Sequence, residues 1–225
     1  KRGNRLRVGE LLEAVYDRLE QAGLAYGHGM EGPLDEAAHL IAQVLFDAPT
    51  LNEAQLNEVV NEASVDQLEQ IVNQRIRARI PAAYLTGEAW FAGVRFEVDP
   101  RVIVPRSPIA ELLAEQLAPW VQPERVGSVL DLCCGSGCIA LVAAMVFPQA
   151  AVVATDLSAD ALAVARHNLN RFEASGELRE GQVRLIQSDL FTALNGQRFD
   201  VIISNPPYVP RERELPEEYL HEPEM

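Results

Sequence analysis

The spacing of apolar residues divides the chain into three parts. Over about the first 80 residues apolar side chains recur every three or four positions, which predicts amphipathic helices. Two such stripes are Leu11, Leu12, Val15 and Leu19, and Val65, Leu68, Ile71, Val72 and Ile76. The glycines around 27–32 mark a loop between them, after which Asp35 is the expected N-cap of a helix that continues through Phe46. The pattern predicts a small helical bundle that ends near Pro81.

From Glu88 the apolar period becomes two, which predicts strands. Residues 90–91 and 94–98 flank Ala92-Gly93, and this arrangement is typical of a β-hairpin. Residues 102–104 are expected to extend it. Ser107 followed by Pro108 predicts the start of a helix with an apolar stripe at Ile109, Leu112, Leu113 and Leu117.

From Ser128 short strands and amphipathic helices alternate. The expected strands are 129–132, 151–155, 183–187 and 201–204, and helices over 139–147 and 160–169 follow the first two. This alternation predicts an α/β fold with a parallel, Rossmann-like sheet. Because such a sheet usually has about six or seven strands, we expect the C-terminal strands to be absent. Strand 201–204 is then an exposed edge prone to aggregation.

Composition narrows the class of partner. The net charge is 19 − 33 = −14, which disfavours a nucleic-acid partner and favours a basic protein. The longest apolar run is too short to cross a bilayer and the N-terminus lacks a signal-peptide pattern, so no membrane partner is expected. Cys133, Cys134 and Cys138 lie within six residues, which suits reduced thiols and a cytoplasmic protein. They lack the paired spacing and nearby histidine of a metal site, so no metal is expected.

A glycine loop between the first parallel strand and its helix is the first candidate site. Gly135 and Gly137 allow the backbone to approach a ligand closely, and the helix N-terminus adds oriented amide donors. A simple turn would give the same pattern. Asp156 ends the next strand, where a carboxylate can accept hydrogen bonds from ribose hydroxyls. Its alternative role is to cap the following helix, which Ser158 could do instead.

Two further features identify the ligand more closely. Asp189 follows the third parallel strand, where the amino group of an adenine would lie, so the three loops together predict an adenosine-containing ligand. Ala140 and Leu141 stand where a dinucleotide-binding loop would place its third glycine. That difference favours S-adenosylmethionine, which has no pyrophosphate, over a nicotinamide cofactor.

The sequence Asn205-Pro206-Pro207-Tyr208 follows the fourth strand and is the second candidate site. The prolines stiffen the turn, so the Asn205 side chain and the Pro206 carbonyl can present two acceptors to one planar NH₂ group. The Tyr208 ring offers a face for stacking. Such a site would catalyse transfer to nitrogen by positioning and electrostatics, without a strong base. The alternative is a rigid turn without function.

Together with the glycine loop and Asp156, this motif resembles the class I S-adenosylmethionine-dependent methyltransferases that modify amide or exocyclic amino nitrogens. The helical N-terminal region and the hairpin resemble the HemK-type protein glutamine methyltransferases. Four stretches resemble the branch that acts on a ribosomal protein: 26–29, 81–86, 104–112 and 221–224. The release-factor branch typically has Pro-Arg-Pro-Glu-Thr where this chain has Pro-Arg-Ser-Pro-Ile at 105–109.

The resemblance implies an S-adenosylmethionine-dependent enzyme that methylates a glutamine side chain of the large-subunit ribosomal protein L three. It implies a substrate-recognition domain over 1–80, a hairpin and linker helix over 81–120, and a cofactor-binding methyltransferase domain over 121–225. The expected catalytic residues are Asn205, Pro206 and Tyr208. The expected cofactor-binding residues are Asp131, Cys133, Gly135, Gly137, Asp156, Asp189, Leu190 and Asn205. The expected substrate-binding residues are Asn205, Pro206, Pro207, Tyr208, Phe91 and Arg106, with core packing an equal alternative for Phe91.

Three other functions stay open. The enzyme could methylate a release factor, or it could methylate an amino group of a nucleic acid. The latter would need a basic stripe, and Arg75, Arg77 and Arg79 are instead expected to form one solvated helical face. The third alternative is a truncated module that binds the cofactor without turnover.

Overall fold

The computed structural model describes residues 6–27, 30–208 and 214–223, and the chain forms two compact units. The first, here called the helical unit, comprises Lys1–Thr86 and Glu214–His221. The second, the α/β unit, comprises Gly87–Arg213 and Glu222–Met225. His28, Gly29 and Glu224, which belong to stretches that carry the resemblance, lie outside the described residues. The expected three-part division into 1–80, 81–120 and 121–225 stays a prediction.

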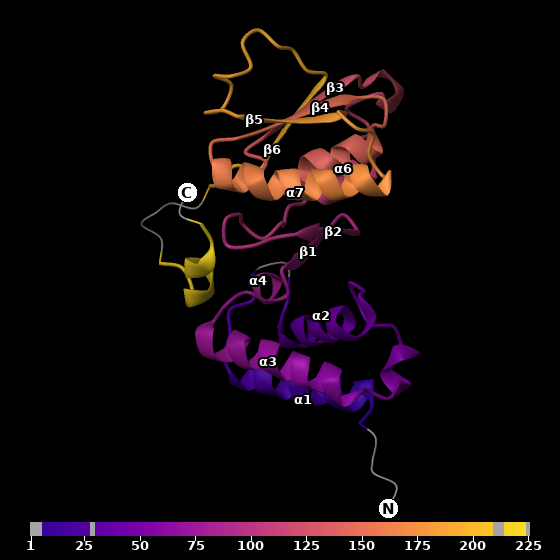
Figure 1. Cartoon of the computed structure of the whole chain (residues 1–225), viewed down its shortest axis with the longest axis vertical. Helices are drawn as coiled ribbons and strands as arrows, with labels where there is room; N and C mark the ends of the chain where they lie inside the picture. Colours follow the sequence, from indigo (N-terminus) through magenta and orange to yellow (C-terminus); the bar gives the residue numbers. More distant parts are fainter. Residues whose placement is uncertain (1–5, 28–29, 209–213, 224–225) are drawn as a thin grey trace, which may run out of the picture. The chain divides into compact units, whose positions relative to one another are not determined.

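Four helices and two short 3₁₀ segments make up the described helical unit (Figure 1). They are α1 (Val8–Gln21), α2 (Pro33–Phe46), η1 (Gln55–Asn57), α3 (Glu62–Ala78), α4 (Ala82–Thr86) and η3 (Glu217–His221). The predicted apolar stripes are confirmed, since α1 buries Leu11, Val15 and Leu19 and α3 buries Leu68 and Val72. These side chains form one core with the buried face of α2.

The start of α2 differs from the prediction. The helix begins at Pro33 with Gly32 as its N-cap, so Asp35 lies in the first turn and is not the cap. Proline suits the first helical position because its φ is already helical and its missing N–H would have no partner there. The Asp35 carboxylate instead accepts the Glu31 N–H at 3.1 Å.

The expectation that Arg75, Arg77 and Arg79 form a solvated face is wrong. Arg75 is only 1% exposed, and its Nε donates to Glu36 Oε1 at 2.7 Å. It lies seven residues after Leu68, on the buried face of α3, and its charge is balanced by buried acids. Arg79 ends the helix in the left-handed conformation and pairs with Glu218 at 3.1 Å.

The α/β unit begins with the predicted hairpin of β1 (Glu88–Phe91) and β2 (Val94–Glu97). Ala92 and Gly93 both have positive φ, as the tight two-residue turn requires. The expected extension over 102–104 is not a strand, because Val102 N–H closes a turn onto Asp99 O at 3.1 Å. α5 (Ile109–Ala114) follows, and the Ser107 hydroxyl accepts the Ile109 N–H at its start.

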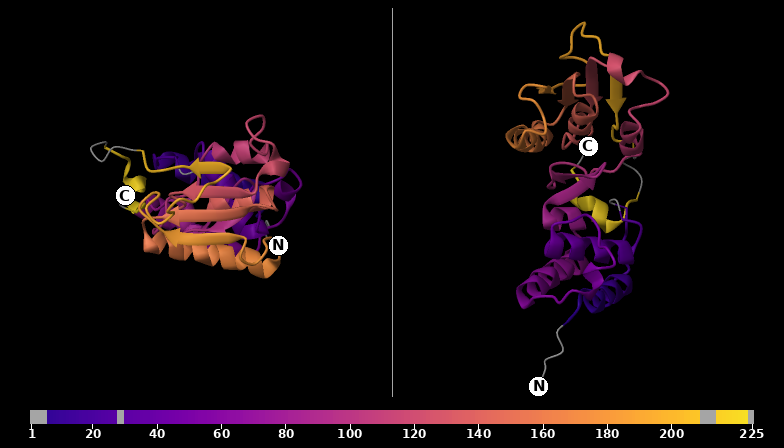
Figure 2. Two further views of the ribbon diagram at one scale, coloured as in Figure 1. Left: turned by 90° about the horizontal axis from the view of Figure 1, so that it is seen from above. Right: turned by 90° about the vertical axis from the view of Figure 1, so that its right-hand side faces the viewer.

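A four-stranded parallel sheet forms the rest of this unit, in the order β5-β4-β3-β6. The strands are β3 (Ser128–Leu132), β4 (Ala151–Asp156), β5 (Val183–Gln187) and β6 (Val201–Ser204). α6 (Cys138–Val146) and α7 (Ala159–Ser175) pack on one face of it (Figures 1 and 2). The predicted Rossmann-like α/β fold is confirmed, and β6 is an edge that pairs only with β3 among the described strands.

The burial of these elements explains their composition. β3 lies between two neighbours and buries residues 129–132, so its side chains are apolar on both faces apart from Asp131. α6 buries every residue from Cys138 to Ala144 and has almost no polar face. None of the described helices is both long and apolar enough to cross a membrane.

Candidate functional site

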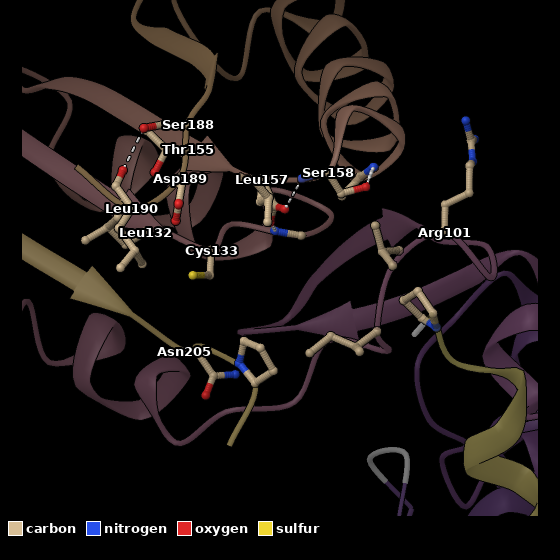
Figure 3. A pocket seen from close by; sticks show the side chains of 17 residues that line it. Arg101, Leu132, Cys133, Thr155, Leu157, Ser158, Ser188, Asp189, Leu190 and Asn205 are labelled. Atoms are coloured by element: carbon tan, nitrogen blue, oxygen red, sulfur yellow. Dashed lines mark hydrogen bonds between the residues drawn. The ribbon is translucent and has the colours of Figure 1, made fainter. Parts of the chain in front are cut away.

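Loops from four parallel strands meet at the carboxyl edge of the sheet and enclose a pocket of about 350 Å³. Figure 3 shows Cys133 between Asn205 on one side and Asp189 and Leu190 on another. The described residues that line the pocket all belong to the α/β unit. They are Arg101, Val102, Ile103, Leu132, Cys133, Gly135, Thr155, Asp156, Leu157, Ser158, Ala161, Ser188, Asp189, Leu190, Asn205, Pro207 and Pro223.

The glycine loop turns the chain from β3 into α6 through three left-handed residues. Cys133, Gly135 and Gly137 have φ values of 62°, 53° and 80°. Gly135 lines the pocket, whereas Gly137 packs against α7 and does not. A Cβ at Gly137 would lie 3.1 Å from Ala165 Cβ, so this position requires glycine for both its conformation and its close packing.

Asp156 lines the pocket and also fixes the loops around it. Its Oδ2 accepts the Gly135 N–H at 2.8 Å and its Oδ1 accepts the Ser158 N–H at 2.9 Å. Each carboxylate oxygen keeps a further lone pair for a ligand. Ser158 caps α7 by accepting the Ala161 N–H at 3.2 Å, the role that the sequence suggested for it in place of Asp156.

The turn after β5 presents a second carboxylate. The Ser188 hydroxyl donates to Leu190 O at 2.8 Å and accepts the Ala193 N–H at 3.1 Å, which stabilises the positive φ of Leu190. Asp189 is exposed, and its carboxylate makes no hydrogen bond or ion pair with the rest of the described chain. Leu157 and Leu190 are 67% and 56% exposed and give the pocket apolar surfaces beside its two acids.

Asp131, one of the expected cofactor residues, is fully buried and does not line the pocket. Its Oδ2 accepts the Ala140 N–H at 3.0 Å, in the first turn of α6, while Oδ1 makes no hydrogen bond with described residues. Burial raises the pKa of this carboxyl to about 8, so the group is largely protonated at neutral pH. Its direct contact with a cofactor stays a prediction.

The Asn205–Tyr208 motif begins directly at the end of β6. The Ser204 hydroxyl donates to Leu132 O at 2.9 Å and joins this strand end to the start of the glycine loop. Asn205 and Pro207 line the pocket, whereas Pro206 and Tyr208 are exposed and do not. Tyr208 is 76% exposed. The catalytic roles of Asn205, Pro206 and Tyr208 stay predictions.

A second cavity of about 30 Å³ adjoins the pocket and shares Ile103, Cys133, Gly135 and Asn205 with it. It brings the remaining expected residues, Phe91 and Arg106, to the same site. Phe91 is only 4% exposed and belongs to the main core of the unit, so its side chain combines core packing with a place in the cavity wall.

The sequence did not indicate several lining residues. The sequence predicts 102–104 as an extension of the hairpin and gives 101–103 no role in a site. The structure places 101–103 in the pocket wall, with the Arg101 side chain paired with Asp99 at 2.6 Å. Nothing in the sequence pattern distinguishes three further lining residues from other positions in or beside strands and helices: Thr155, Ala161 and Ser188. Leu157 could have been predicted, because it directly follows Asp156 at the end of a strand and therefore lies at the edge of the sheet where ligands bind. The described residues contain no cluster of His, Cys, Asp or Glu that could hold a metal ion.

Comparison with known proteins identifies the family. The model of the methyltransferase small domain matches residues 109–218. The ribosomal protein uL3 glutamine methyltransferase of Burkholderia pseudomallei is 46% identical, over 97% of this chain and 73% of that protein. The enzyme of the same name from Bordetella pertussis is 45% identical, over 96% of this chain and 72% of that protein. Among solved structures, the T. thermophilus 16S rRNA N2 G1207 methyltransferase in complex with AdoMet and guanosine is 26% identical, with a TM-score of 0.42, over 60% of this chain and 36% of that one.

The first two relatives align with almost the whole of this chain, including both of its units and the motif at Asn205–Tyr208. At this level of identity, the chain belongs to the family of the ribosomal protein uL3 glutamine methyltransferases.

Proposed function

We propose that this protein transfers a methyl group from S-adenosylmethionine to the side-chain amide nitrogen of a glutamine in ribosomal protein uL3. The observation that carries the proposal is that Asn205 lines the same pocket as Asp156 and Asp189. A planar amide and two carboxylates from three successive strand ends therefore face one ligand-sized space. The relatives named for the uL3 reaction support the choice of substrate.

The pocket fits S-adenosylmethionine in size and in chemistry. About 350 Å³ lies within the range of roughly 300–1,000 Å³ that is typical of small-molecule sites. Asp156 is suited to accept hydrogen bonds from the ribose hydroxyls and Asp189 from the adenine amino group. Leu157 and Leu190 supply apolar surface for the adenine ring. The two acids also favour a cationic ligand, and S-adenosylmethionine supplies a reactive methyl group on a positively charged sulfur.

In this proposal the chain's own contribution to chemistry is positioning. The Asn205 Oδ1 and the Pro206 carbonyl accept the two N–H bonds of the substrate amide. An amide nitrogen is a poor nucleophile because its lone pair is delocalised, and two fixed acceptors favour the geometry in which that lone pair is localised. As the N–C bond forms and the bond between the methyl group and sulfur breaks, the nitrogen becomes more acidic and releases one proton to water. Asn205 accepts these hydrogen bonds without placing a net charge of its own beside the cation.

The Cys133 thiol must stay protonated in this arrangement. It lines both cavities, and a thiolate there would compete with the substrate nitrogen for the methyl group. Burial raises the pKa of Cys133, and the nearby Asp156 carboxylate raises it further. The group therefore stays a neutral thiol, which is a weak nucleophile at neutral pH.

The charge of the whole chain supports a basic protein substrate. A net charge of −14 attracts basic proteins and repels nucleic-acid phosphates. We assign recognition of the substrate protein to the helical unit as part of the same proposal.

The test is methyl transfer from isotopically labelled S-adenosylmethionine to purified, RNA-free uL3, followed by mass spectrometry of the labelled peptide. We expect one methyl group on one glutamine side chain, and strongly reduced labelling when Asn205→Ala replaces the wild type. A release factor and a ribosomal RNA fragment serve as comparison substrates under the same conditions. Label on either one, with none on uL3, would refute the proposed substrate. Binding of the cofactor without label on any of them would favour a non-catalytic module.

A further inference from the structure

Asn168 is a buried polar residue in the middle of α7 that the proposed mechanism does not use. Its exposed fraction is 0%, and the helix around it buries Val164, Ala165, Leu169 and Phe172. Asparagine is unfavourable inside a helix, and an amide buried without partners destabilises the fold. This amide, however, has three hydrogen bonds, and all three lead to other elements of the α/β unit.

The first two hydrogen bonds join α7 to β2. Asn168 Oδ1 accepts the Glu97 N–H at 2.9 Å, and Nδ2 donates to Glu97 O at 2.9 Å. A side-chain amide has the same donor and acceptor pair as a peptide group, so Asn168 acts as a partner for the edge of β2. Arg171 reinforces this contact one turn later by donating to the Arg95 carbonyl.

The third hydrogen bond joins α7 to the glycine loop. The other N–H of Nδ2 donates to Ser136 O at 3.1 Å, between Gly135 and Gly137. Ala165, three residues before Asn168 and on the same face of α7, is the side chain that leaves no room for a Cβ at Gly137. This part of α7 therefore supports the glycine loop by both packing and hydrogen bonding.

The two segments that Asn168 joins both lead into the pocket wall. Gly135 lines the pocket and lies next to Ser136 in the chain. The chain that leaves β2 at Glu97 reaches the wall at Arg101, Val102 and Ile103. Gly135 in turn donates its N–H to Asp156 at 2.8 Å, so hydrogen bonds connect β2, Asn168, the glycine loop and Asp156.

We propose that Asn168 is a positioning residue that sets the geometry of the methyl-donor pocket by holding the glycine loop against the hairpin. This inference rests on the proposed use of an S-adenosyl cofactor. Asn168 does not line the pocket, so it acts through the backbone of Ser136 and Glu97. Removing its side chain leaves the buried Ser136 carbonyl and the partly buried N–H and carbonyl of Glu97 without their partner, and it frees the loop to shift.

The test is the dissociation constant of S-adenosylhomocysteine, measured by calorimetry on the full chain well below the unfolding temperature of each variant. For Asn168→Ala we expect this constant to rise roughly ten- to a hundredfold, the size of loss that follows removal of an outer supporting hydrogen bond at metal sites. The matched control is Asn170→Ala, because Asn170 is an exposed residue of the same type on the same helix. We expect that control to bind like the wild type.

A second variant covers the case in which Asn168→Ala does not fold. Asn168→Asp keeps the shape and the acceptor for the Glu97 N–H, but at neutral pH it loses the donors to Glu97 O and Ser136 O. We expect it to weaken binding as well. A folded variant with a lower melting temperature but an unchanged dissociation constant would show a purely structural role and overturn the inference. Failure of the wild type itself to bind would instead refute the proposed cofactor, and the inference with it.

Discussion

At the scale of single residues, the candidate site depends on which polar groups carry a charge. Asn205 is neutral and faces the position proposed for a cationic cofactor, while Asp156 and Asp189 supply the negative charge of the pocket. Asp131, only two residues before Cys133, is buried and keeps its proton because burial raises its pKa to about 8. Cys133 keeps its proton for the same reason. Burial thus keeps Asp131 and the Cys133 thiol neutral next to the charged acids of the pocket.

Replacing Asn205 tests its role as an acceptor. For Asn205→Ala we expect kcat to fall by roughly 10²- to 10³-fold, the usual effect of removing one positioned hydrogen-bonding group at a reacting centre. The dissociation constant of S-adenosylhomocysteine should change much less, because Asn205 is one of many groups around the pocket. Single-turnover kinetics and calorimetry separate the two quantities. The control is Asn195→Ala, because Asn195 is exposed and lies outside the pocket. If the turnover of Asn205→Ala stayed within a fewfold of this control, the acceptor model would be excluded.

The raised pKa of Asp131 predicts how stability varies with pH. The carboxyl ionises near pH 4 in the unfolded chain but keeps its proton to about pH 8 in the folded one. Between these two pH values the folded state therefore binds one proton more than the unfolded state. The free energy of unfolding falls as the pH rises through this range. Asp131→Asn removes this titration and can still accept the Ala140 N–H. Chemical unfolding at pH 5, 6, 7 and 8 should show the wild type losing stability relative to this variant, and parallel curves would contradict the prediction.

At the scale of elements, the close fit between α7 and the glycine loop determines the shape of the pocket edge. Gly137 is the N-cap of α6 and has a left-handed conformation, and α7 approaches it so closely that only glycine fits. Asn168 fixes the same region through hydrogen bonds. The loop is therefore held from the side of the helices, while its other side remains available to a ligand.

Substituting Gly137 measures this fit. Gly137→Ala should lower the free energy of unfolding by roughly 2–4 kcal/mol, because about 1–2 kcal/mol of left-handed strain adds to overpacking against Ala165. Gly176→Ala is the matched control, since Gly176 has the same φ of 80° but open space around the added Cβ. We expect the control to cost only about 1–2 kcal/mol. Equal losses in urea unfolding would show that contact with Ala165 is unimportant.

At the scale of the whole molecule, buried charges tie a segment near the C-terminal end to helices from the N-terminal end. Glu218, in η3, is 1% exposed and pairs with Arg79 at 3.1 Å. It also accepts the Ala25 N–H at 2.9 Å and lies 3.6 Å from the Arg75 guanidinium, which pairs with Glu36. Segments more than 130 residues apart in sequence thus share one buried network in the helical unit.

Replacing Glu218 tests this network. Glu218→Gln should lower the free energy of unfolding of the helical unit by about 1.5–3 kcal/mol, since Arg79 loses its charged partner and Arg75 keeps only Glu36. Glu217→Gln is the control, because Glu217 is its exposed neighbour. Hydrogen exchange at α3 and η3 reports on this unit, and equal exchange in the two variants would contradict the expected role.

The same carboxylate predicts a loss of stability in acid. Burial raises the pKa of Glu218, but hydrogen bonds from the Ala25 N–H and Arg79 outweigh it and leave the pKa below its usual value of 4.5. Because the pKa of Glu218 is lower in the folded state, the ionised carboxylate stabilises the fold at pH values above 4.5. This contribution is lost as the pH falls through the pKa of the folded state. Unfolding curves between pH 6 and pH 3 should therefore approach those of Glu218→Gln at the acidic end. A constant difference would exclude ionised Glu218 as the source.

The sequence by itself predicted most of the α-helices, the hairpin, the parallel strands and the edge strand β6, because each has a hydrophobic period or turn residues of its own. It did not predict α4 or the 3₁₀ segments. It also placed Asp156, Asp189 and Asn205 at strand ends, where a parallel sheet gathers its ligand groups. Only the tertiary structure decided which of these side chains share a pocket with residues 101–103. It alone revealed the burial of Arg75 and Asp131 and the three partners of Asn168. Those properties depend on groups brought together from distant parts of the chain, and no local pattern records them.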